Sequence, residues 1–213
     1  LEDWIALAKS VWQQAYPAYV GTDQCIGIIN AAHFERLSGY VAEARACGVR
    51  VEGLNRDVPD PARRHFPLTL VVDPPADLGC MTEEVFGPVI PVVPYDDVDS
   101  AFAWINAGET PLGAYIATQD TALARRFVRE VRSGGAAVNN FGLQGGHVAL
   151  PFGGLGNSGQ GCHSAKQGFL NYSHAKSVFR GSADNIVHKV LEPPLSDLTG
   201  MEIANASLLD EAT

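Results

Sequence analysis

The sequence predicts an α/β protein whose helices cover a mostly parallel sheet of short strands. Apolar residues recur at helical spacing near the N-terminus, and short β-branched runs bounded by proline or glycine follow them. Strand and helix patterns then alternate over residues 89–139, which is typical of βαβ units. With 213 residues, of which 46% are hydrophobic, the chain can bury one sizeable core or form one domain with an extension.

The first half of the chain holds two predicted helices followed by two predicted strands. An apolar stripe over residues 4–15 fits one helix, and a second stripe over residues 34–44 fits another, which Gly48 is placed to end. The β-branched runs at residues 68–72 and 89–93 predict strands. Prolines within and around the second run cannot donate to a sheet, so we expect that strand to lie at an edge or to be irregular.

The second half continues the alternation. Asp97 and Asp120 are suitable N-caps for two helices, because an aspartate side chain can accept hydrogen bonds from the first free backbone amides. Residues 112–117 predict a strand between these helices, and residues 136–139 predict a last, buried strand after them. Residues 173–179 have the composition of one further strand.

A glycine-rich stretch over residues 141–161 contains eight glycines and little periodicity, and it predicts a long ordered loop or a binding loop. It includes Gly154-Leu155-Gly156-Asn157-Ser158-Gly159, which satisfies the GxGxxG string of dinucleotide-binding proteins. That motif needs a strand before it and a helix after it, whereas Pro151 interrupts the first and residues 160–166 carry no apolar stripe. We therefore interpret the string as a turn-rich loop.

Charge and cysteine content argue against several classes of function. The 15 basic and 24 acidic residues give a formal charge of −9, and an acidic surface repels nucleic acid and anionic membranes. No apolar run is long enough to span a bilayer. Four scattered cysteines without a CxxC pair predict reduced thiols in a cytoplasmic protein. Because Leu1 leads directly into a helical pattern, we expect the sequence to begin at an internal cut in a longer protein.

The hexapeptide Glu83-Glu84-Val85-Phe86-Gly87-Pro88 combines two carboxylates, an aromatic ring and a Gly-Pro turn ahead of a strand. A carboxylate can accept two hydrogen bonds from a ribose diol, and an aromatic face can pack against a nicotinamide ring. These residue types therefore suit the nicotinamide end of a dinucleotide. The plainer interpretation, an exposed glutamate pair beside a core phenylalanine, is the stronger one while the hexapeptide stands alone.

Asn139 and Asn140 close the last predicted strand at its carboxyl end, where ligands bind in open α/β sheets. Rings and amides that suit a pocket lining follow shortly afterwards: Phe141, Gln144, His147 and Phe152. Considered alone, His147 is better explained as an exposed loop histidine.

No set of residues completes a reaction. The sequence has no serine, histidine and acid arrangement with an elbow motif, no HExxH, no metal-ligand spacing and no Walker loop. Cys25 has neither a positive charge nearby nor a helix N-terminus that would stabilise a thiolate, so a structural thiol is the better interpretation. The sequence thus predicts neither a catalytic residue nor a metal site.

Taken together and in order, these segments resemble the aldehyde dehydrogenase superfamily. The resemblance covers residues 1–180 and rests on these motifs: Ile28-Ile29-Asn30 ahead of Phe34, Glu83-Glu84-Val85-Phe86-Gly87-Pro88, Asp97 opening Phe102 to Asn106, Ser133-Gly134-Gly135-Ala136-Ala137-Val138-Asn139, Leu150-Pro151-Phe152-Gly153-Gly154, Ser158-Gly159 and Ser173-His174-Ala175-Lys176-Ser177-Val178. The serine and histidine before Ala175-Lys176, and the leucine before Pro-Phe-Gly-Gly, are most similar to the coniferyl-aldehyde and fatty or aromatic aldehyde branch.

The resemblance implies a partial aldehyde-dehydrogenase-like catalytic domain and an enzyme that oxidises an aldehyde to a carboxylic acid with NAD or NADP. In this family a cysteine thiolate attacks the aldehyde and an oxyanion hole holds the alkoxide. Hydride then passes to the nicotinamide, and a glutamate-activated water hydrolyses the thioester. The cofactor domain, the nucleophilic cysteine and the general-base glutamate are expected upstream of Leu1, so we expect this chain to be inactive alone.

The resemblance also implies roles for residues within the chain. Glu84 would accept hydrogen bonds from ribose hydroxyls, and Phe86 would pack against the nicotinamide ring. Asn139 would support the active-site loops. The aldehyde entrance would be lined by Asn140, His147 and Phe152.

The resemblance predicts three regions. Residues 1–170 are the C-terminal part of a catalytic domain that lacks the nucleophile loop, residues 171–182 form an oligomerisation arm, and residues 183–213 form an acidic tail. The expected partners are a small aldehyde and further copies of the chain. Two alternatives stay open, a non-catalytic assembly or structural fragment and an unrelated small-ligand-binding α/β domain. The coding sequence upstream of Leu1 would discriminate between them.

Overall fold

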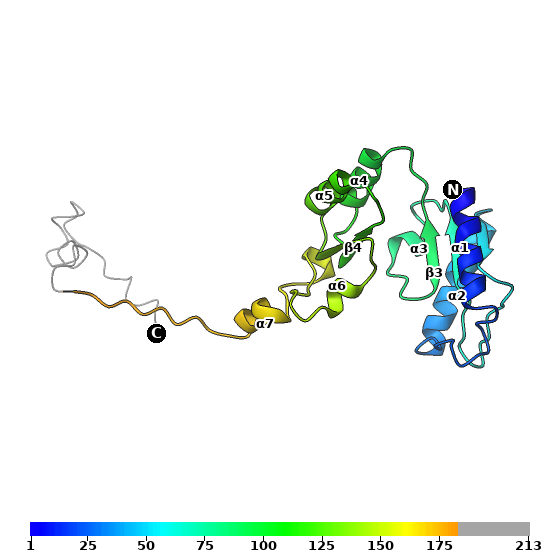
Figure 1. Cartoon of the computed structure of the whole chain (residues 1–213). Helices are drawn as coiled ribbons and strands as arrows, with labels where there is room; N and C mark the ends of the chain where they lie inside the picture. Colours follow the sequence, from blue (N-terminus) through cyan, green and yellow to red (C-terminus); the bar gives the residue numbers. More distant parts are fainter. Residues whose placement is uncertain (183–213) are drawn as a thin grey trace, which may run out of the picture. The chain divides into compact units, whose positions relative to one another are not determined.

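The computed structural model describes residues 1–182 of the chain, whose helices and short strands are shown in Figure 1. The chain divides into two compact units. The first comprises Leu1–Glu109 and Arg129–Val131, and the second comprises the remaining described residues. The predicted acidic tail, residues 183–213, lies outside the described residues.

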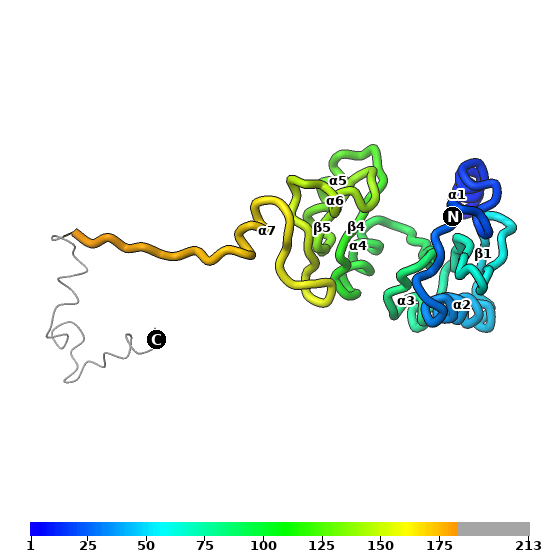
Figure 2. Tube along the Cα trace, turned by 90° about the horizontal axis from the view of Figure 1, so that it is seen from below, coloured from blue at the N-terminus to red at the C-terminus, as the bar shows by residue number. Residues whose placement is uncertain are grey.

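The first unit is a three-stranded sheet with helices on both faces. Its elements are α1 (Glu2–Ala15), α2 (Ala31–Ala46), β1 (Arg50–Gly53), β2 (Thr69–Val72), α3 (Gly79–Thr82), β3 (Val89–Val92) and α4 (Val98–Ala107). The strand order is β1-β2-β3, with β1 antiparallel and β3 parallel to the central β2. In Figure 2, α1 and α2 lie on opposite sides of this sheet.

The central strand β2 explains why both faces need a helix. All four of its residues are buried, and side chains of successive residues point to opposite faces of a sheet. Val71 belongs to the core cluster formed by the apolar face of α2. Leu70 and Val72 belong to the cluster that includes Ile5 of α1. The continuous apolar run of β2 thus contributes side chains to two core clusters, one on each face of the sheet, as is typical of strands buried on both faces.

The predicted caps are present at the helix ends. Asp97 Oδ1 accepts a hydrogen bond from the Ser100 amide at 2.8 Å, and Asp120 Oδ1 accepts one from the Ala122 amide at 2.7 Å. Gly48 follows α2 with φ +74°, a left-handed conformation that glycine adopts without a steric penalty. The first two predicted helices and the strands at 68–72 and 89–93 are also present, within a few residues of their expected ends.

The second unit is built on two parallel strands. Its elements are β4 (Gly113–Ile116), α5 (Thr121–Glu130), β5 (Gly135–Val138), α6 (Leu143–Gly146), the 3-10 helix η1 (Gly156–Ser158) and α7 (Ala165–Asn171). β4 and β5 pair in parallel, with α5 as the connection between them, so this segment is the predicted βαβ unit.

One expectation about these strands was wrong. The last strand is half-buried rather than buried, since among the described residues β5 pairs with β4 alone, and Val138 is 38% exposed. In the first unit, Pro91 in β3 lacks a donor for a further partner, which fits the edge position that β3 has in its sheet.

Several local elements were not predicted. β1 was missed because its apolar and charged residues alternate over only four positions, and α3, α6, η1 and α7 are too short to give a periodic signal. The glycine-rich stretch contains η1 and turns, as the loop interpretation of GxGxxG predicted. Residues 173–182 form neither a helix nor a strand here, so the further strand expected at 173–179 is absent from the described chain. Among the described residues, no helix is both long enough and apolar enough to cross a membrane.

Candidate functional site

The hexapeptide at residues 83–88 lies in the first unit, between α3 and β3, and α2 holds it in place. One polar ridge of α2 faces this segment, with residues spaced three or four apart as neighbours on a helix surface must be. Its members are His33, Arg36, Tyr40 and Glu43. The adjacent face of α2, with Phe34, Leu37, Val41 and Ala44, is buried in the core, and Tyr40 at the boundary is buried with it.

The guanidinium group of Arg36 donates hydrogen bonds to the backbone of the segment. Nη1 donates to the Glu84 carbonyl at 2.8 Å, and Nη2 donates to the Val85 carbonyl at 2.9 Å. Nη1 also donates to the Tyr40 hydroxyl at 2.7 Å, and Nη2 lies 3.2 Å from His33 Nδ1. Two consecutive carbonyls that no strand satisfies thus receive charge-assisted hydrogen bonds.

Tyr40 holds the start of the segment, and Glu43 holds the start of α3 just before it. The Tyr40 hydroxyl donates to Glu83 Oε2 at 2.6 Å, and the Gly79 amide donates to Glu43 Oε2 at 3.1 Å. Burial raises the pKa of Tyr40, and its hydrogen bond to the Glu83 carboxylate raises it further. Tyr40 therefore remains a neutral donor at neutral pH, and it binds the exposed Glu83 carboxylate to the helix.

Phe86 follows the residues that Arg36 and Tyr40 bind. The backbone turns there with φ +45°, an uncommon conformation for an aromatic residue. At Gly87 the chain passes so close to the core that a Cβ would lie 2.5 Å from Leu37 Cδ1. The Phe86 ring is 77% exposed and Glu84 is also exposed, so the core-phenylalanine interpretation does not hold. The structure presents a carboxylate and an aromatic ring on a fixed backbone.

Asn139 joins the ends of β4 and β5 in the second unit. Its amide donates to the Ile116 carbonyl at 2.8 Å, which continues the ladder by one step. Its side chain then forms the pair of hydrogen bonds that a neighbouring strand would otherwise form. Oδ1 accepts from the Thr118 amide at 2.8 Å, and Nδ2 donates to the Thr118 carbonyl at 2.9 Å. With φ +52°, Asn139 turns the chain away from the sheet. This geometry suits support of the loops at the carboxyl end of the parallel strands.

The loop after Asn139 folds back over β4. The Phe141 ring lies 4.5 Å from the Tyr115 ring, and Gln144 Nε2 donates to the Tyr115 hydroxyl at 2.9 Å. Asn140 and His147 are both exposed on this loop. Asn140 Oδ1 accepts from the Phe141 amide and His147 Nδ1 accepts from the Ala149 amide, so both side chains shape local turns.

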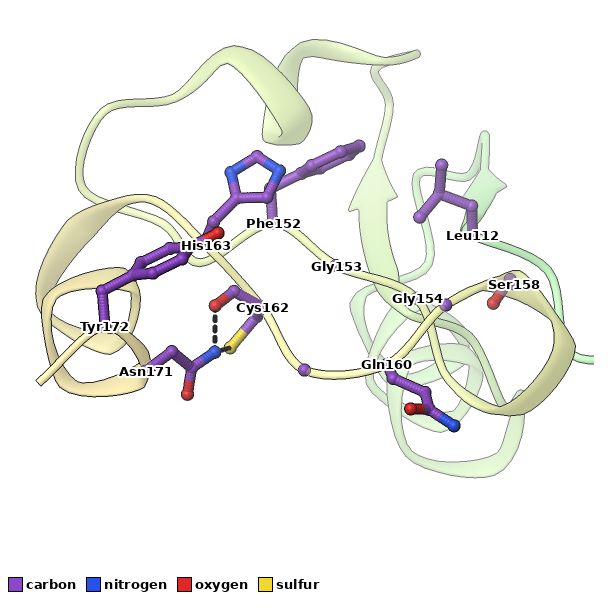
Figure 3. Close-up of a pocket in the computed structure, with 12 residues that line it drawn as sticks. Leu112, Phe152, Gly153, Gly154, Ser158, Gln160, Cys162, His163, Asn171 and Tyr172 are labelled. Atoms are coloured by element: carbon purple, nitrogen blue, oxygen red, sulfur yellow. Dashed lines mark hydrogen bonds between the residues drawn. The ribbon is translucent and has the colours of Figure 1, made fainter. Parts of the chain in front are cut away.

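A pocket of about 560 Å³ lies beside Phe152 in the second unit (Figure 3). Its lining combines glycine backbone with a few polar side chains and rings: Leu112, Phe152, Gly153, Gly154, Ser158, Gly159, Gln160, Gly161, Cys162, His163, Asn171 and Tyr172. Phe152 and His163 exchange backbone hydrogen bonds of 2.8 Å, and their rings meet edge to face at 5.3 Å. The Asn171 side chain donates to the Cys162 carbonyl, as Figure 3 shows.

The predicted site residues therefore fall into two groups. Glu84 and Phe86 share one segment of the first unit, and Asn139 and Asn140 are adjacent at a strand end of the second. Among the expected entrance residues, Phe152 lines the pocket, whereas Asn140 and His147 are not among its lining residues. Sequence reasoning missed Arg36 and the pocket residues Cys162, His163 and Asn171. For Arg36 the available signal was a row of polar side chains at helical spacing beside the buried stripe.

The described part of the chain offers no buried thiol suited to nucleophilic catalysis. Burial raises the pKa of Cys25 and of Cys80, which disfavours the thiolate and agrees with the structural interpretation of Cys25. All four cysteines are free of disulfide bonds. No group of three or more histidine, cysteine, aspartate or glutamate side chains among residues 1–182 could hold a metal ion.

Comparison with known proteins now connects these features. The sequence profile of the aldehyde dehydrogenase family matches residues 20–178, which include both groups of site residues. The chain belongs to the aldehyde dehydrogenase family. The resemblance drawn from the motifs is confirmed, and the α/β fold of a partial catalytic domain is confirmed with it.

Relatives within the aldehyde dehydrogenase family include the probable coniferyl aldehyde dehydrogenase of Caulobacter vibrioides. It is 34% identical over 201 residues, which are 92% of this chain and 41% of the relative. The dimeric NADP-preferring aldehyde dehydrogenase of Rattus norvegicus is 31% identical, over 78% of this chain and 36% of that protein. A solved Mycobacterium tuberculosis aldehyde dehydrogenase complexed with NAD+ has a TM-score of 0.66 and 25% identity, covering 75% of this chain and 33% of that one. The chain thus spans about 40% of the length of the curated relatives it matches.

Proposed function

We propose that this chain is the part of an NAD(P)-dependent aldehyde dehydrogenase that presents the nicotinamide end of the cofactor and the aldehyde entrance. The enzyme would convert an aldehyde, water and NAD(P)+ into a carboxylic acid, NAD(P)H and a proton. The observation that carries the proposal is the family match over residues 20–178, combined with a rigidly held loop that exposes Glu84 and Phe86. The Caulobacter vibrioides relative supports the coniferyl-aldehyde branch. The NADP-preferring rat enzyme and the NAD+ complex of the Mycobacterium tuberculosis enzyme support either NADP or NAD as the cofactor.

The residues of the loop fit the cofactor by their chemistry. The nicotinamide ring, when bound, accepts the hydride that leaves the substrate carbon. Glu84 would accept hydrogen bonds from the ribose hydroxyls, and Phe86 would hold the ring plane. Asn139 would fix the carboxyl end of β4 and β5, and Asn140, His147 and Phe152 would line the aldehyde entrance. Arg36 anchors the loop at the Glu84 carbonyl, so the Glu84 carboxylate stays available.

The proposal includes a longer parent enzyme, in which the nucleophilic cysteine and the general base precede this segment. Cys25 and Cys80 are buried, which raises the pKa of both thiols, so these two cysteines are poorly suited to attack an aldehyde. The test is NAD(P)H production by the 213-residue chain with aromatic and aliphatic aldehydes, and we expect none. Turnover that is abolished in Cys25→Ala or Cys162→Ala would contradict the proposal, because a cysteine of this segment would then be the nucleophile.

Glu84 and Phe86 provide the second test, in the enzyme that contains this segment. Glu84→Gln keeps the side-chain shape but weakens the acceptor, which should cost roughly 1–3 kcal/mol of interaction with a ribose hydroxyl. Single-turnover hydride transfer should slow more than cofactor binding weakens, because the loop orients a ring. The exposed Glu35→Gln on α2 is the matched control and should leave both unchanged. Normal rates in both Glu84→Gln and Phe86→Ala would refute the assignment.

We also propose a cytoplasmic homo-oligomer in which residues 171–182 act as the arm between subunits. All residues of this segment are exposed in the isolated chain, including Val178 and Phe179. Residues 174–182, beyond the end of α7, belong to no helix or strand, and exposed chain of this kind is suited to strand addition. Light scattering should give a mass above the 22.7 kDa of one chain and a smaller assembly after deletion from Asn171 onward. A monodisperse monomer of the intact chain would end this part of the proposal.

A further inference from the structure

Between α2 and β3 the segment of residues 83–87 is held from two sides. Arg36 holds the backbone carbonyls of Glu84 and Val85, and Tyr40 holds the Glu83 carboxylate. On the other side the buried Leu37 side chain packs directly against Gly87. Phe86 lies between these two fixed points. Its backbone connects them by adopting a left-handed conformation with φ +45°. Such a conformation persists only where surrounding structure over-determines it.

Arg36 is the part of this arrangement that lies outside the core. It is half-buried, whereas Leu37 and Tyr40 are buried among the residues of the first core cluster. Its four contacts all go to α2 itself or to the loop, and two of them reach consecutive loop carbonyls. A planar fork can make this pair of hydrogen bonds, whereas the single ammonium group of lysine cannot reproduce it.

We propose that Arg36 is the positioning residue that sets the Glu84–Phe86 loop for hydride transfer. It does not touch the cofactor in this assignment, and it acts through the two carbonyls that it holds. This inference rests on the proposed function of Glu84 and Phe86. Without Arg36 the two carbonyls turn to water, the Phe86 backbone relaxes from its left-handed conformation, and the ring and carboxylate lose their common orientation.

The first experiment measures loop order in the 213-residue chain itself by 15N relaxation. Amides of residues 84–86 should have order parameters near 0.85 in the native chain, falling below about 0.6 in Arg36→Ala. Arg36→Lys should fall between them. Arg45→Ala is the matched control, because Arg45 is an exposed arginine in the last turn of the same helix and should change nothing. Tyr40→Phe removes only the hydroxyl that holds Glu83, and it should loosen residue 83 more than residue 86.

Order parameters of β2 are read in the same spectra and report whether each variant has kept its fold. Should Arg36→Ala lose that order as well, Arg36→Lys takes its place, since lysine keeps a long aliphatic stem and a positive charge. Native order at residues 84–86 in a folded Arg36→Ala or Arg36→Lys chain would overturn the inference.

The second experiment connects loop order to chemistry in the enzyme that contains this segment. Arg36→Lys should slow single-turnover hydride transfer about tenfold and enlarge the isotope effect of a deuterated aldehyde, with the aldehyde KM nearly unchanged. Slowed transfer in Glu84→Gln alone, with normal transfer in Arg36→Lys, would overturn the inference and leave the proposed function standing. Normal transfer in Glu84→Gln, Phe86→Ala and Arg36→Lys together would overturn both.

Discussion

Gly87 is where the candidate cofactor loop meets the core, and Gly87→Ala tests that contact. A Cβ at this position would lie 2.5 Å from Leu37 Cδ1, 2.7 Å from Cδ2 and 3.2 Å from Cγ. Favourable carbon contacts lie at about 3.5–4.0 Å, so two atoms would have to move by roughly 1 Å. Leu37 has no exposed surface and packs in the cluster of Phe34, Val71 and Val89, which leaves it little room to move.

The expected cost of Gly87→Ala is therefore that of overpacking a core, about 1–3 kcal/mol of unfolding free energy. Gly39→Ala is the matched control on the same helix that carries Leu37. No atom lies within 4 Å of a Cβ built there, and the position is an exposed helix interior. Alanine should stabilise it by about 0.5–1 kcal/mol. The same substitution thus has opposite signs at the two glycines.

Urea unfolding followed by tryptophan fluorescence measures both variants. All three tryptophans, Trp4, Trp12 and Trp104, belong to the first unit, so the signal reports the unit that contains both glycines. A stability loss in Gly87→Ala with an unchanged m-value is the expected result. Equal stability of Gly87→Ala and Gly39→Ala would refute the close packing of the loop on Leu37. Such a result would also contradict the backbone conformation of Phe86, which depends on that packing.

Two further predictions concern the ends of other elements. Asn139→Ala removes both side-chain hydrogen bonds to Thr118 and places alanine at φ +52°, so calorimetry should detect a loss of about 1–3 kcal/mol, of which Asn139→Gly recovers the backbone part. The Ser100 amide lowers the pKa of Asp97 below its ordinary value of about 3.9, so the stabilisation by this cap is present above about pH 4 and is lost as the pH falls through the folded-state pKa. Urea midpoints across the acid range should therefore depend less on pH in Asp97→Ala, and an unchanged profile would contradict the cap.

Sequence reasoning predicted the features that depend on neighbours along the chain. The helix stripes, the caps at Asp97 and Asp120 and the left-handed Gly48 follow from side-chain spacing and backbone preference, which act within one or two turns. The hexapeptide at residues 83–88 was identified from its residue types, and its role as a cofactor loop stays a prediction. The family could be inferred because many such local motifs occur in one order.

The tertiary structure decided what depends on residues distant in sequence. Arg36 lies 48 positions from the Glu84 carbonyl that it holds, and no spacing rule connects an arginine on one helix to the carbonyls of a later loop. The Asn139 side chain pairs with Thr118 across 21 positions, and strand partners such as β1 with β2 are chosen by core packing rather than by their own apolar pattern. Local preference is encoded residue by residue, whereas these contacts form only after loop closure has brought both partners together.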